Sequence, residues 1–167
     1  GVSIGGHDTL VCDHGDDDGG SKRGSAYICF GAGTSWSAQA KLTALDAAGL
    51  SDFCGSSVSI SGDSAVVGAY GNDDGGIFSG SAYIYKRDGT AWAQQAKLTA
   101  DDAATDDQFG HSVSISGDYT VVGAHGNDDG GSNSGSAYIF FRSGTTWTQQ
   151  AKLTALDAAG LSDFCGS

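Results

Sequence analysis

The sequence repeats itself three times, and this repetition constrains the fold more than any other feature. Distinctive residues recur at offsets of 56 and then 55 residues. The clearest markers are Trp36, Trp92 and Trp147, Gly24, Gly80 and Gly135, and Val2, Val58 and Val113. In each copy a phenylalanine follows the tryptophan by 17 residues, at Phe53, Phe109 and Phe164, and only the join after it varies, FCGSSV at 53–58 against FGHSV at 109–113. On this alignment Cys54 and Cys165 are each the extra residue of their join. Such a period is typical of blades, solenoid turns or arrays, in which each unit buries its apolar surface against the next.

The two ends of the chain belong to the same repeat. The last residues, LSDFCGS at 161–167, repeat LSDFCGS at 50–56, which the sequence SVSISGD follows. The chain begins with the related sequence GVSIGGHD, so joining its end to its beginning restores the interval seen in the middle. We therefore expect blades at about residues 1–52, 53–108 and 109–163, with 164–167 starting the first strand of the next blade.

The composition and net charge of the chain indicate which kinds of molecule it is expected to bind. With 28 glycines and no proline, the sequence favours many tight turns, and no apolar run approaches the ~20 residues that span a bilayer. A net charge of −12 disfavours nucleic acid, which binds basic surfaces. We expect no nucleic-acid partner and no membrane insertion. The excess of acidic residues instead favours divalent cations as counter-charge.

The four cysteines, Cys12, Cys29, Cys54 and Cys165, have no CxxC pair and no zinc-type spacing. An even number of cysteines in an acidic, glycine-rich chain favours disulfides and an extracellular or cell-surface location. Three pairings are open. If Cys165 lies beside Cys12 where the two ends meet, that bond joins two molecules; buried thiols, or bonds within one chain, are the alternative.

Within one repeat, hydrophobic alternation predicts four strands and no helix. In the last copy we expect them at residues 111–116, 119–124, 136–142 and 146–154, with tight turns between them. The central strands are apolar on both faces, and a sheet buried on both sides needs a neighbour on each side. The sequence therefore predicts an all-β protein of three four-stranded antiparallel blades, the arrangement of a β-propeller, completed by self-assembly or by further repeats.

Each unit resembles the FG-GAP repeat of integrin-like β-propellers, most closely its bacterial secreted form. The resemblance rests on FG at 109–110, SVSISGD at 112–118, VVGAH at 121–125 and GSAYIF at 135–140. It implies a ring of six or seven blades and a role as an extracellular adhesion, surface or ligand-binding module. Integrin-type blades carry a calcium loop between the first and second strands, whereas this chain has a bare turn at 62–63 and 117–118. That calcium site is therefore not carried over, and the first unit departs further, with LVCDH at 10–14.

One acidic loop recurs in every repeat. Its oxygen-bearing residues are Asp16, Asp17 and Asp18, then Asn72, Asp73 and Asp74, then Asn127, Asp128 and Asp129, each set followed by two glycines. Carboxylates and carbonyls on a tightly curved backbone are ligands for Ca²⁺, which makes these loops candidate calcium sites. The EF-hand spacing is absent. The alternative is a solvated turn in which Asn and Asp side chains bond to their own backbone.

Aromatic residues recur at strand positions of every unit: Trp36, Trp92 and Trp147 with Tyr27, Tyr83 and Tyr138. We predict that they pack between blades rather than stack on sugars. His14 and His125 precede two of the acidic loops, but Tyr70 takes the same place in the middle copy, so packing is favoured there over metal ligation.

These features together predict a protein that is not an enzyme. No GxSxG nucleophile motif is present in a strand-to-helix setting, and catalysis normally breaks repeat symmetry. Three blades leave two apolar sheet faces open, so the chain is expected to pair with itself or with further repeats in a ring or a filament. The expected function is that of a non-catalytic extracellular structural protein, stabilised by blade packing, disulfides and Ca²⁺. The alternative is an adhesin or lectin-like module that binds glycans or a cell-surface ligand.

Overall fold

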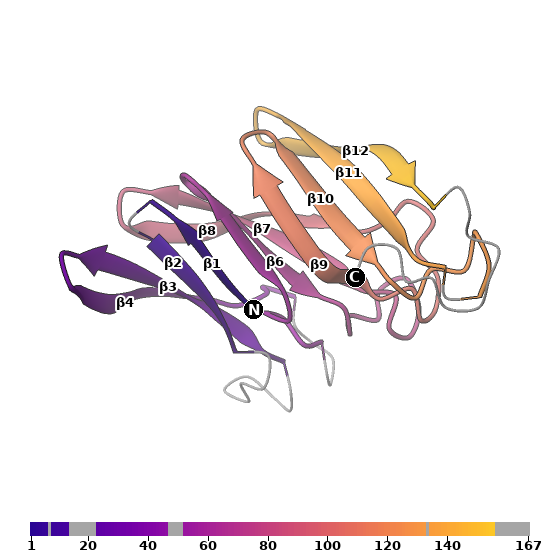
Figure 1. Ribbon diagram of the computed structural model, residues 1–167, viewed down its shortest axis with the longest axis horizontal. Helices are drawn as coiled ribbons and strands as arrows, with labels where there is room; N and C mark the ends of the chain where they lie inside the picture. The colour runs from indigo at the N-terminus through magenta and orange to yellow at the C-terminus, as the bar shows by residue number, and fades with distance from the viewer. Residues whose placement is uncertain (7, 14–22, 47–51, 133, 156–167) are drawn as a thin grey trace.

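The computed structural model describes residues 1–6, 8–13, 23–46, 52–132 and 134–155. Within these residues the protein consists of twelve strands and contains no helix. The strands form three separate four-stranded antiparallel sheets, which stand side by side like an open fan (Figure 1). The predicted fold class of three four-stranded propeller blades is confirmed.

Each sheet is a meander in which every strand pairs with the next one in the sequence. The first sheet contains β1 (Val2–Gly5), β2 (Asp8–Asp13), β3 (Ser25–Ala32) and β4 (Ser35–Leu42). The second contains β5 (Val58–Ser61), β6 (Ser64–Ala69), β7 (Ser81–Asp88) and β8 (Ala91–Leu98). The third contains β9 (Phe109–Ser116), β10 (Tyr119–Ala124), β11 (Ser136–Ser143) and β12 (Thr146–Leu153). Strand β9 begins two residues earlier than predicted.

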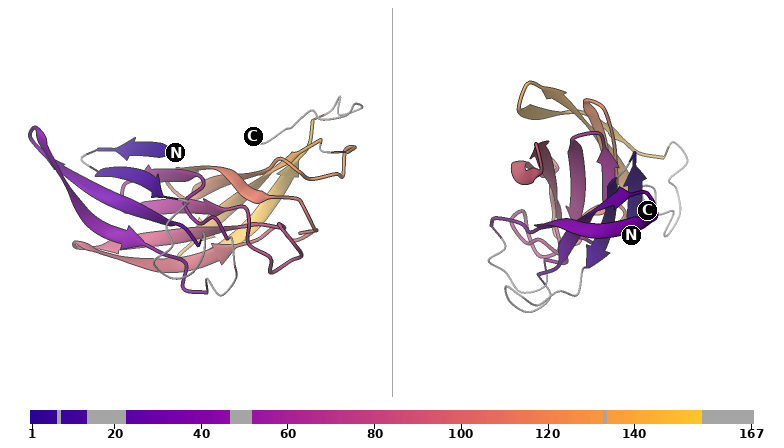
Figure 2. Two further views of the ribbon diagram at one scale, coloured as in Figure 1. Left: turned by 90° about the horizontal axis from the view of Figure 1, so that it is seen from below. Right: turned by 90° about the vertical axis from the view of Figure 1, so that its left-hand side faces the viewer.

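Neighbouring sheets contact each other in the same way at both interfaces. The first strands touch at one edge, β1 against β5 and β5 against β9, and the fourth strands touch at the other, β4 against β8 and β8 against β12. The sheets stack in chain order, with the second sheet between the first and the third (Figures 1 and 2). This is the radial arrangement of propeller blades.

Every sheet has two faces, because side chains alternate along a strand. We call the face toward the following sheet the forward face and the face toward the preceding sheet the backward face. In the second sheet, Val66 and Ile84 lie on the forward face, and Val67, Tyr83 and Tyr85 lie on the backward face. All five are buried. The apolar character of both faces, predicted from the sequence, is explained by a neighbour on each side.

The two hydrophobic cores are the two interfaces between sheets. The first core joins the forward face of sheet one to the backward face of sheet two, and the second joins sheet two to sheet three in the same way. The largest contributors to the first are Leu10, Ile28, Leu42, Val58, Ile60, Tyr83 and Tyr85. Those of the second are Val66, Ile84, Leu98, Phe109, Ile115, Val122, Tyr138 and Phe140. Burying one such side chain contributes roughly 1.5–3 kcal/mol, and the buried apolar residues of the described chain belong to these two interfaces, so hydrophobic stabilisation acts between blades.

One equivalence drawn from the sequence is wrong: the counterpart of Phe109 is Cys54, not Phe53. The backbone N–H of Cys54 donates to the carbonyl of Arg23 at 2.9 Å, and that of Phe109 donates to the carbonyl of Ser79 at 3.0 Å, one repeat later. The side chains of Cys54 and Phe109 are both fully buried, each in the core at the start of its blade. Cys54 is therefore a core residue and not an insertion.

Phe53 instead takes the place of Gln108, whose positive backbone φ it shares, 51° against 56°. Its ring stacks on Tyr70 at 5.1 Å between centroids, outside the core. The extra residue of the first repeat thus lies in the linker between Leu42 and Cys54. The two phenylalanines look equivalent in the sequence because each follows a tryptophan by 17 residues. Equal spacing does not show whether the two side chains are equally buried.

Candidate functional site

A tryptophan–glutamine hydrogen bond recurs at each interface between sheets. Trp92 Nε1 donates to Gln39 Oε1 at 3.2 Å, and Trp147 Nε1 donates to Gln95 Oε1 at 3.1 Å. Both indoles also pack against the core of their interface. Trp36, the equivalent residue of the first sheet, lies on a backward face that none of the three described sheets covers, and it is 51% exposed.

An arginine lies against the tryptophan at each internal interface. The Arg87 guanidinium stacks on the Trp92 ring at 5.5 Å from its centroid and pairs with Asp8 of the preceding sheet at 2.8 Å. Arg142 stacks on the next tryptophan in the same way, at 5.6 Å, and its Nη1 donates to Ser64 Oγ at 3.4 Å. The arginine therefore ties its own sheet to the second strand of the sheet before it.

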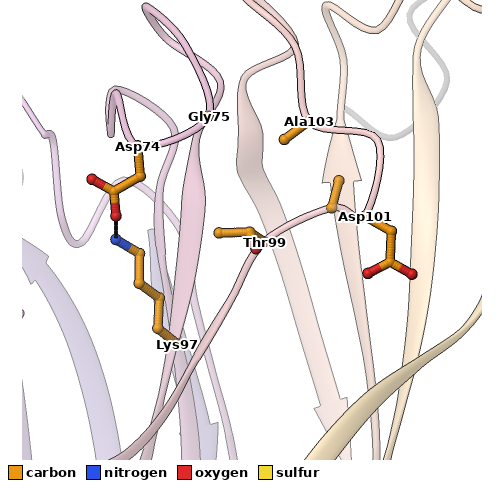
Figure 3. A pocket seen from close by; sticks show the side chains of 7 residues that line it. Asp74, Gly75, Lys97, Thr99, Asp101 and Ala103 are labelled. Atoms are coloured by element: carbon orange, nitrogen blue, oxygen red, sulfur yellow. Dashed lines mark hydrogen bonds and ion pairs between the residues drawn. The ribbon is translucent and has the colours of Figure 1, made fainter.

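In the second and third sheets a lysine bridges the linker before the sheet to the acidic loop within it. Lys97 Nζ pairs with Asp46 at 2.6 Å and also with Asp74 (Figure 3), and it lies 5.4 Å from the Tyr83 ring centroid. Burial lowers the pKa of Lys97, but its hydrogen bonds to the two carboxylates outweigh burial, so the pKa lies above its usual value. The ammonium stays charged and acts as the counter-charge of the loop.

The third sheet repeats this network. Lys152 Nζ pairs with Asp102 at 2.6 Å and with Asp129, and it lies 5.2 Å from the centroid of the Tyr138 ring. The phenol of Tyr138 donates to Asp102 Oδ1 at 2.9 Å. Burial and this hydrogen bond raise the pKa of Tyr138. The rings of Tyr83 and Tyr138 are thus buried in the interfaces, and each contacts the lysine of its own sheet.

The acidic loops satisfy their own backbone. Asn72 Oδ1 accepts hydrogen bonds from Asp74 N at 3.3 Å and from Ser81 Oγ at 2.8 Å. Asp73 Oδ1 accepts from the N–H of Phe78 at 2.8 Å. The bond from Asp74 N to Asn72, two residues earlier, is that of an Asx turn.

The next loop copies this geometry. Asn127 Oδ1 accepts from Asp129 N at 3.4 Å and from Ser136 Oγ at 2.7 Å. Asn72 and Asn127 are both buried. In both loops the asparagine side chain is therefore buried and holds the loop by hydrogen bonds within it.

Calcium binding by these loops stays a prediction. Residues 16–18 lie outside the described residues, and among those that are described no group of three His, Cys, Asp or Glu side chains is placed to hold a metal ion. A thermal melt with EDTA and with added Ca²⁺ tests it. A fall in melting temperature on chelation supports calcium binding, and unchanged melting removes it.

The described cysteines are free thiols. Cys12 and Cys54 both pack in the first core, whereas Cys29 lies on β3. Burial raises the pKa of the Cys54 thiol to about 12, which keeps it protonated and unreactive. Cys165 lies outside the described residues, so disulfide formation involving it stays a prediction.

Four aromatic rings follow one another in contact from the second blade to the third, two from each blade. Phe53 stacks on Tyr70, Tyr70 lies 5.8 Å from His111, and His111 lies 4.0 Å from His125 between ring centroids. His111 Nδ1 is buried without a hydrogen-bond partner. Burial and the neighbouring His111 lower the pKa of His125. The predicted packing role of His125 agrees with this position, while His14 lies outside the described residues.

We expect stability to fall as the pH falls through the usual histidine range. Because the pKa of His125 is lower in the folded protein than its value of 6.5 in a free chain, the unfolded chain binds more protons, and protonation favours unfolding. The melting temperature should therefore drop between about pH 7 and about pH 5.

His125→Tyr is the matched variant, because Tyr70 occupies the equivalent place in the second sheet. It should weaken this pH dependence while leaving melting near neutral pH largely unchanged. A pH profile identical to that of the wild type would assign the effect to other groups. The buried carboxyls of Asp52 and Asp107 are not the cause, since burial raises the pKa of each and so favours folding at low pH.

Among the described residues, the outward faces of the first and third sheets carry exposed apolar side chains. On the backward face of the first sheet, Val2 is 69% and Ile4 is 67% exposed, whereas their counterparts Val58 and Ile60 are 9% and 6% exposed. The difference arises from position in the stack and not from residue type. This face is made of the residue positions that form the internal cores.

The forward face of the third sheet shows the same contrast. Leu153 is 48% exposed, against 2% for Leu42 and 3% for Leu98 at the equivalent positions. Val121 and Tyr119 on β10 are also exposed. The three described sheets thus present two different apolar outer faces, each of which matches one half of an internal interface.

Shallow pockets recur beside the tryptophans. One, of about 320 Å³, is lined by Leu45, Trp92 and Gln94, and its repeat-equivalent, of about 380 Å³, by Asp101, Trp147 and Gln149. In each, the glutamine side chain accepts a hydrogen bond from the linker backbone, at 3.0 Å from Leu45 N and 3.2 Å from Asp101 N. A third pocket, between the acidic loop and the following linker, is shown in Figure 3.

Reasoning from sequence missed the polar partners that join the sheets. The glutamines at 39 and 95, the arginines at 87 and 142 and the lysines at 97 and 152 were not identified as site residues. One signal was available for the glutamines: Gln39, Gln95 and Gln150 recur at the repeat offsets, as do the tryptophans.

The fold and its interfaces define a β-propeller-type repeat protein. The FG-GAP repeat model matches residues 36–85 and 92–140, more than half of the chain, and the protein belongs to this family. Each matched segment runs from the fourth strand of one sheet to the third strand of the next, so the family unit spans an interface between blades. Among curated proteins none matches the sequence. FG-GAP repeats are typically extracellular, and the described residues include no helix long and apolar enough to cross a membrane.

Proposed function

We propose that the protein is a non-catalytic structural module of an extracellular assembly, in which its blades extend a propeller or a head-to-tail fibre. The observation that carries this proposal is the pair of open apolar faces on the first and third sheets. They carry the residue types that are buried at the internal interfaces, and contiguous exposed apolar side chains normally mark an interaction surface.

The placement of the polar residues supports a structural role. The repeated arginines, lysines and glutamines are used to link one sheet to the next, and the buried asparagines hold the acidic loops. Repetition of one set of contacts at each interface is what a stacking module requires. A catalytic centre would instead need one place where the residues differ from their counterparts.

The experiment is a measurement of particle mass. Light scattering of the purified wild-type chain over a dilution series should give particles of two or more copies of the 16.7 kDa chain, and negative-stain images should show whether they are rings or fibres. A single copy at every concentration would overturn the proposal.

A second candidate function is ligand binding by the pockets beside Trp92 and Trp147. It is favoured because these pockets combine an indole with polar groups at two equivalent places, an arrangement suited to sugar rings. A glycan array with the wild type and a Trp92→Ala variant tests it. Binding that the substitution abolishes would support this adhesin-like function, and an array without binding would remove it.

A further inference from the structure

We propose that the forward face of the third sheet binds the backward face of the first sheet of a second copy, in the register of the two internal interfaces. This inference rests on the proposed structural function and names its partner. The two faces differ from each other, so the contact is head to tail, and repetition of such a contact produces a ring or a filament.

The apolar residues of the two end faces are complementary by position. At the second internal interface, Leu98 and Ile84 on the forward face lie in one core with Ile115 on the backward face. The same positions on the end faces are Leu153 and Ile139 on one copy and Ile4 on the other. Docking in the internal register would bury these side chains as their counterparts are buried.

Two polar contacts of the internal interfaces can form again at this joint. Trp36 Nε1 occupies the donor position of Trp92, and Gln150 the acceptor position of Gln39. Gln150 is exposed and uses its Nε2 to donate to Thr148, which leaves Oε1 as an acceptor. A tryptophan–glutamine bond would then cross every joint between sheets.

The second polar contact runs along the first strands. Ile60 N donates to Ser3 Oγ at 3.2 Å, and Ile115 N donates to Ser59 Oγ at 3.2 Å. At the new joint the donor is the backbone N–H of Ile4, and the acceptor is Ser114 of the other copy. Ser114 is exposed on the third sheet.

At one pair of facing positions, the side-chain sizes at the proposed joint are the reverse of those at the internal interfaces. At the first internal interface Arg87 reaches Asp8, and at the second Arg142 reaches Ser64. The arginine position in the first sheet is Gly31, and the position of its partner in the third sheet is Tyr119. At the internal interfaces the large residue is on the backward face, whereas at the proposed joint the large residue, Tyr119, is on the forward face.

The surroundings of these two residues fit the exchange. The Trp36 ring lies against Gly31, since a Cβ on Gly31 would be 2.9 Å from the indole. Tyr119 is exposed on the forward face, with its ring 5.0 Å from that of Phe141. A tyrosine side chain from the second copy fills the space that arginine takes at the internal interfaces. This pairing of small with large favours a second copy over an unrelated partner.

The test is a set of variants of the full chain, measured by sedimentation velocity over a dilution series. Gly31→Arg adds a side chain that clashes with Tyr119 of the next copy, and Tyr119→Asp removes the ring that fills the joint. Each should weaken self-association by about tenfold. The double variant G31R/Y119D places arginine opposite aspartate, as Arg87 is opposite Asp8, and should regain most of the loss.

Ile77→Asp is the matched control, because Ile77 is an exposed apolar residue in a loop of the middle blade and on neither end face. It should leave self-association unchanged, and circular dichroism checks that every variant is folded. If the wild type assembles but the double variant shows no recovery, or Ile77→Asp weakens assembly as much as the others, this interface is wrong while the structural function stands. A wild type that never assembles would overturn the proposed function itself.

Discussion

Replacing Gly80 with alanine is expected to destabilise the protein by on the order of 4 kcal/mol, a loss that belongs with the largest single-residue effects. Gly80 has a φ of +83°, and a Cβ at this position would lie 2.0 Å from the carbonyl oxygen and 2.5 Å from the amide nitrogen of Phe109. Both atoms belong to the backbone that enters β9, so no side-chain rotation relieves the contact. The second and third sheets would have to separate.

The matched control is Gly89→Ala in the hairpin between β7 and β8. Gly89 also has a positive φ, +62°, but a Cβ there would meet no atom within 4 Å. It should therefore cost only the strain of a left-handed alanine, about 1–2 kcal/mol. In thermal melts a domain of this size loses about 2–4 °C per kcal/mol, so the two variants should differ clearly. Equal losses would show that the close approach of Gly80 to Phe109 does not hold the sheets together.

Replacing Phe109 with alanine is expected to cost about 3–5 kcal/mol, the range for removing a buried aromatic ring. The ring is fully buried and meets Tyr138 and Phe140 edge to face, at 5.4 Å and 5.9 Å between centroids. Its loss opens a cavity between the second and third sheets, where rigid strands limit collapse. Chemical denaturation measures the loss.

Phe53→Ala is the control that separates the two ways of aligning the repeats. If Phe53 were the counterpart of Phe109, the two substitutions would cost the same. Because Phe53 is only half-buried and stacks on Tyr70 outside the core, we expect a loss of roughly 1 kcal/mol. Equal losses would contradict the equivalence of Cys54 and Phe109.

The sequence determined the repeating unit, the all-β class and the four strands of each sheet. These features depend on patterns within one repeat, such as the alternation in residues 111–116 and the turns at 117–118. The central strands carry apolar residues on both faces, and a sheet that is apolar on both faces needs a neighbouring sheet on each side. The stacking of the sheets could therefore be predicted from the pattern within one repeat. The FG-GAP resemblance, which rested on short motifs, is confirmed by the family to which the chain belongs.

Only the tertiary structure decided which residues meet between sheets. Trp92 and Gln39 are 53 positions apart in the chain, and Arg87 and Asp8 are 79 apart. No local pattern pairs them, because partners across an interface are chosen by the packing of two sheets and not by spacing along one strand. The same reason explains why Cys54 was misplaced: its burial depends on the neighbouring blade, and burial is a property of the assembled sheets.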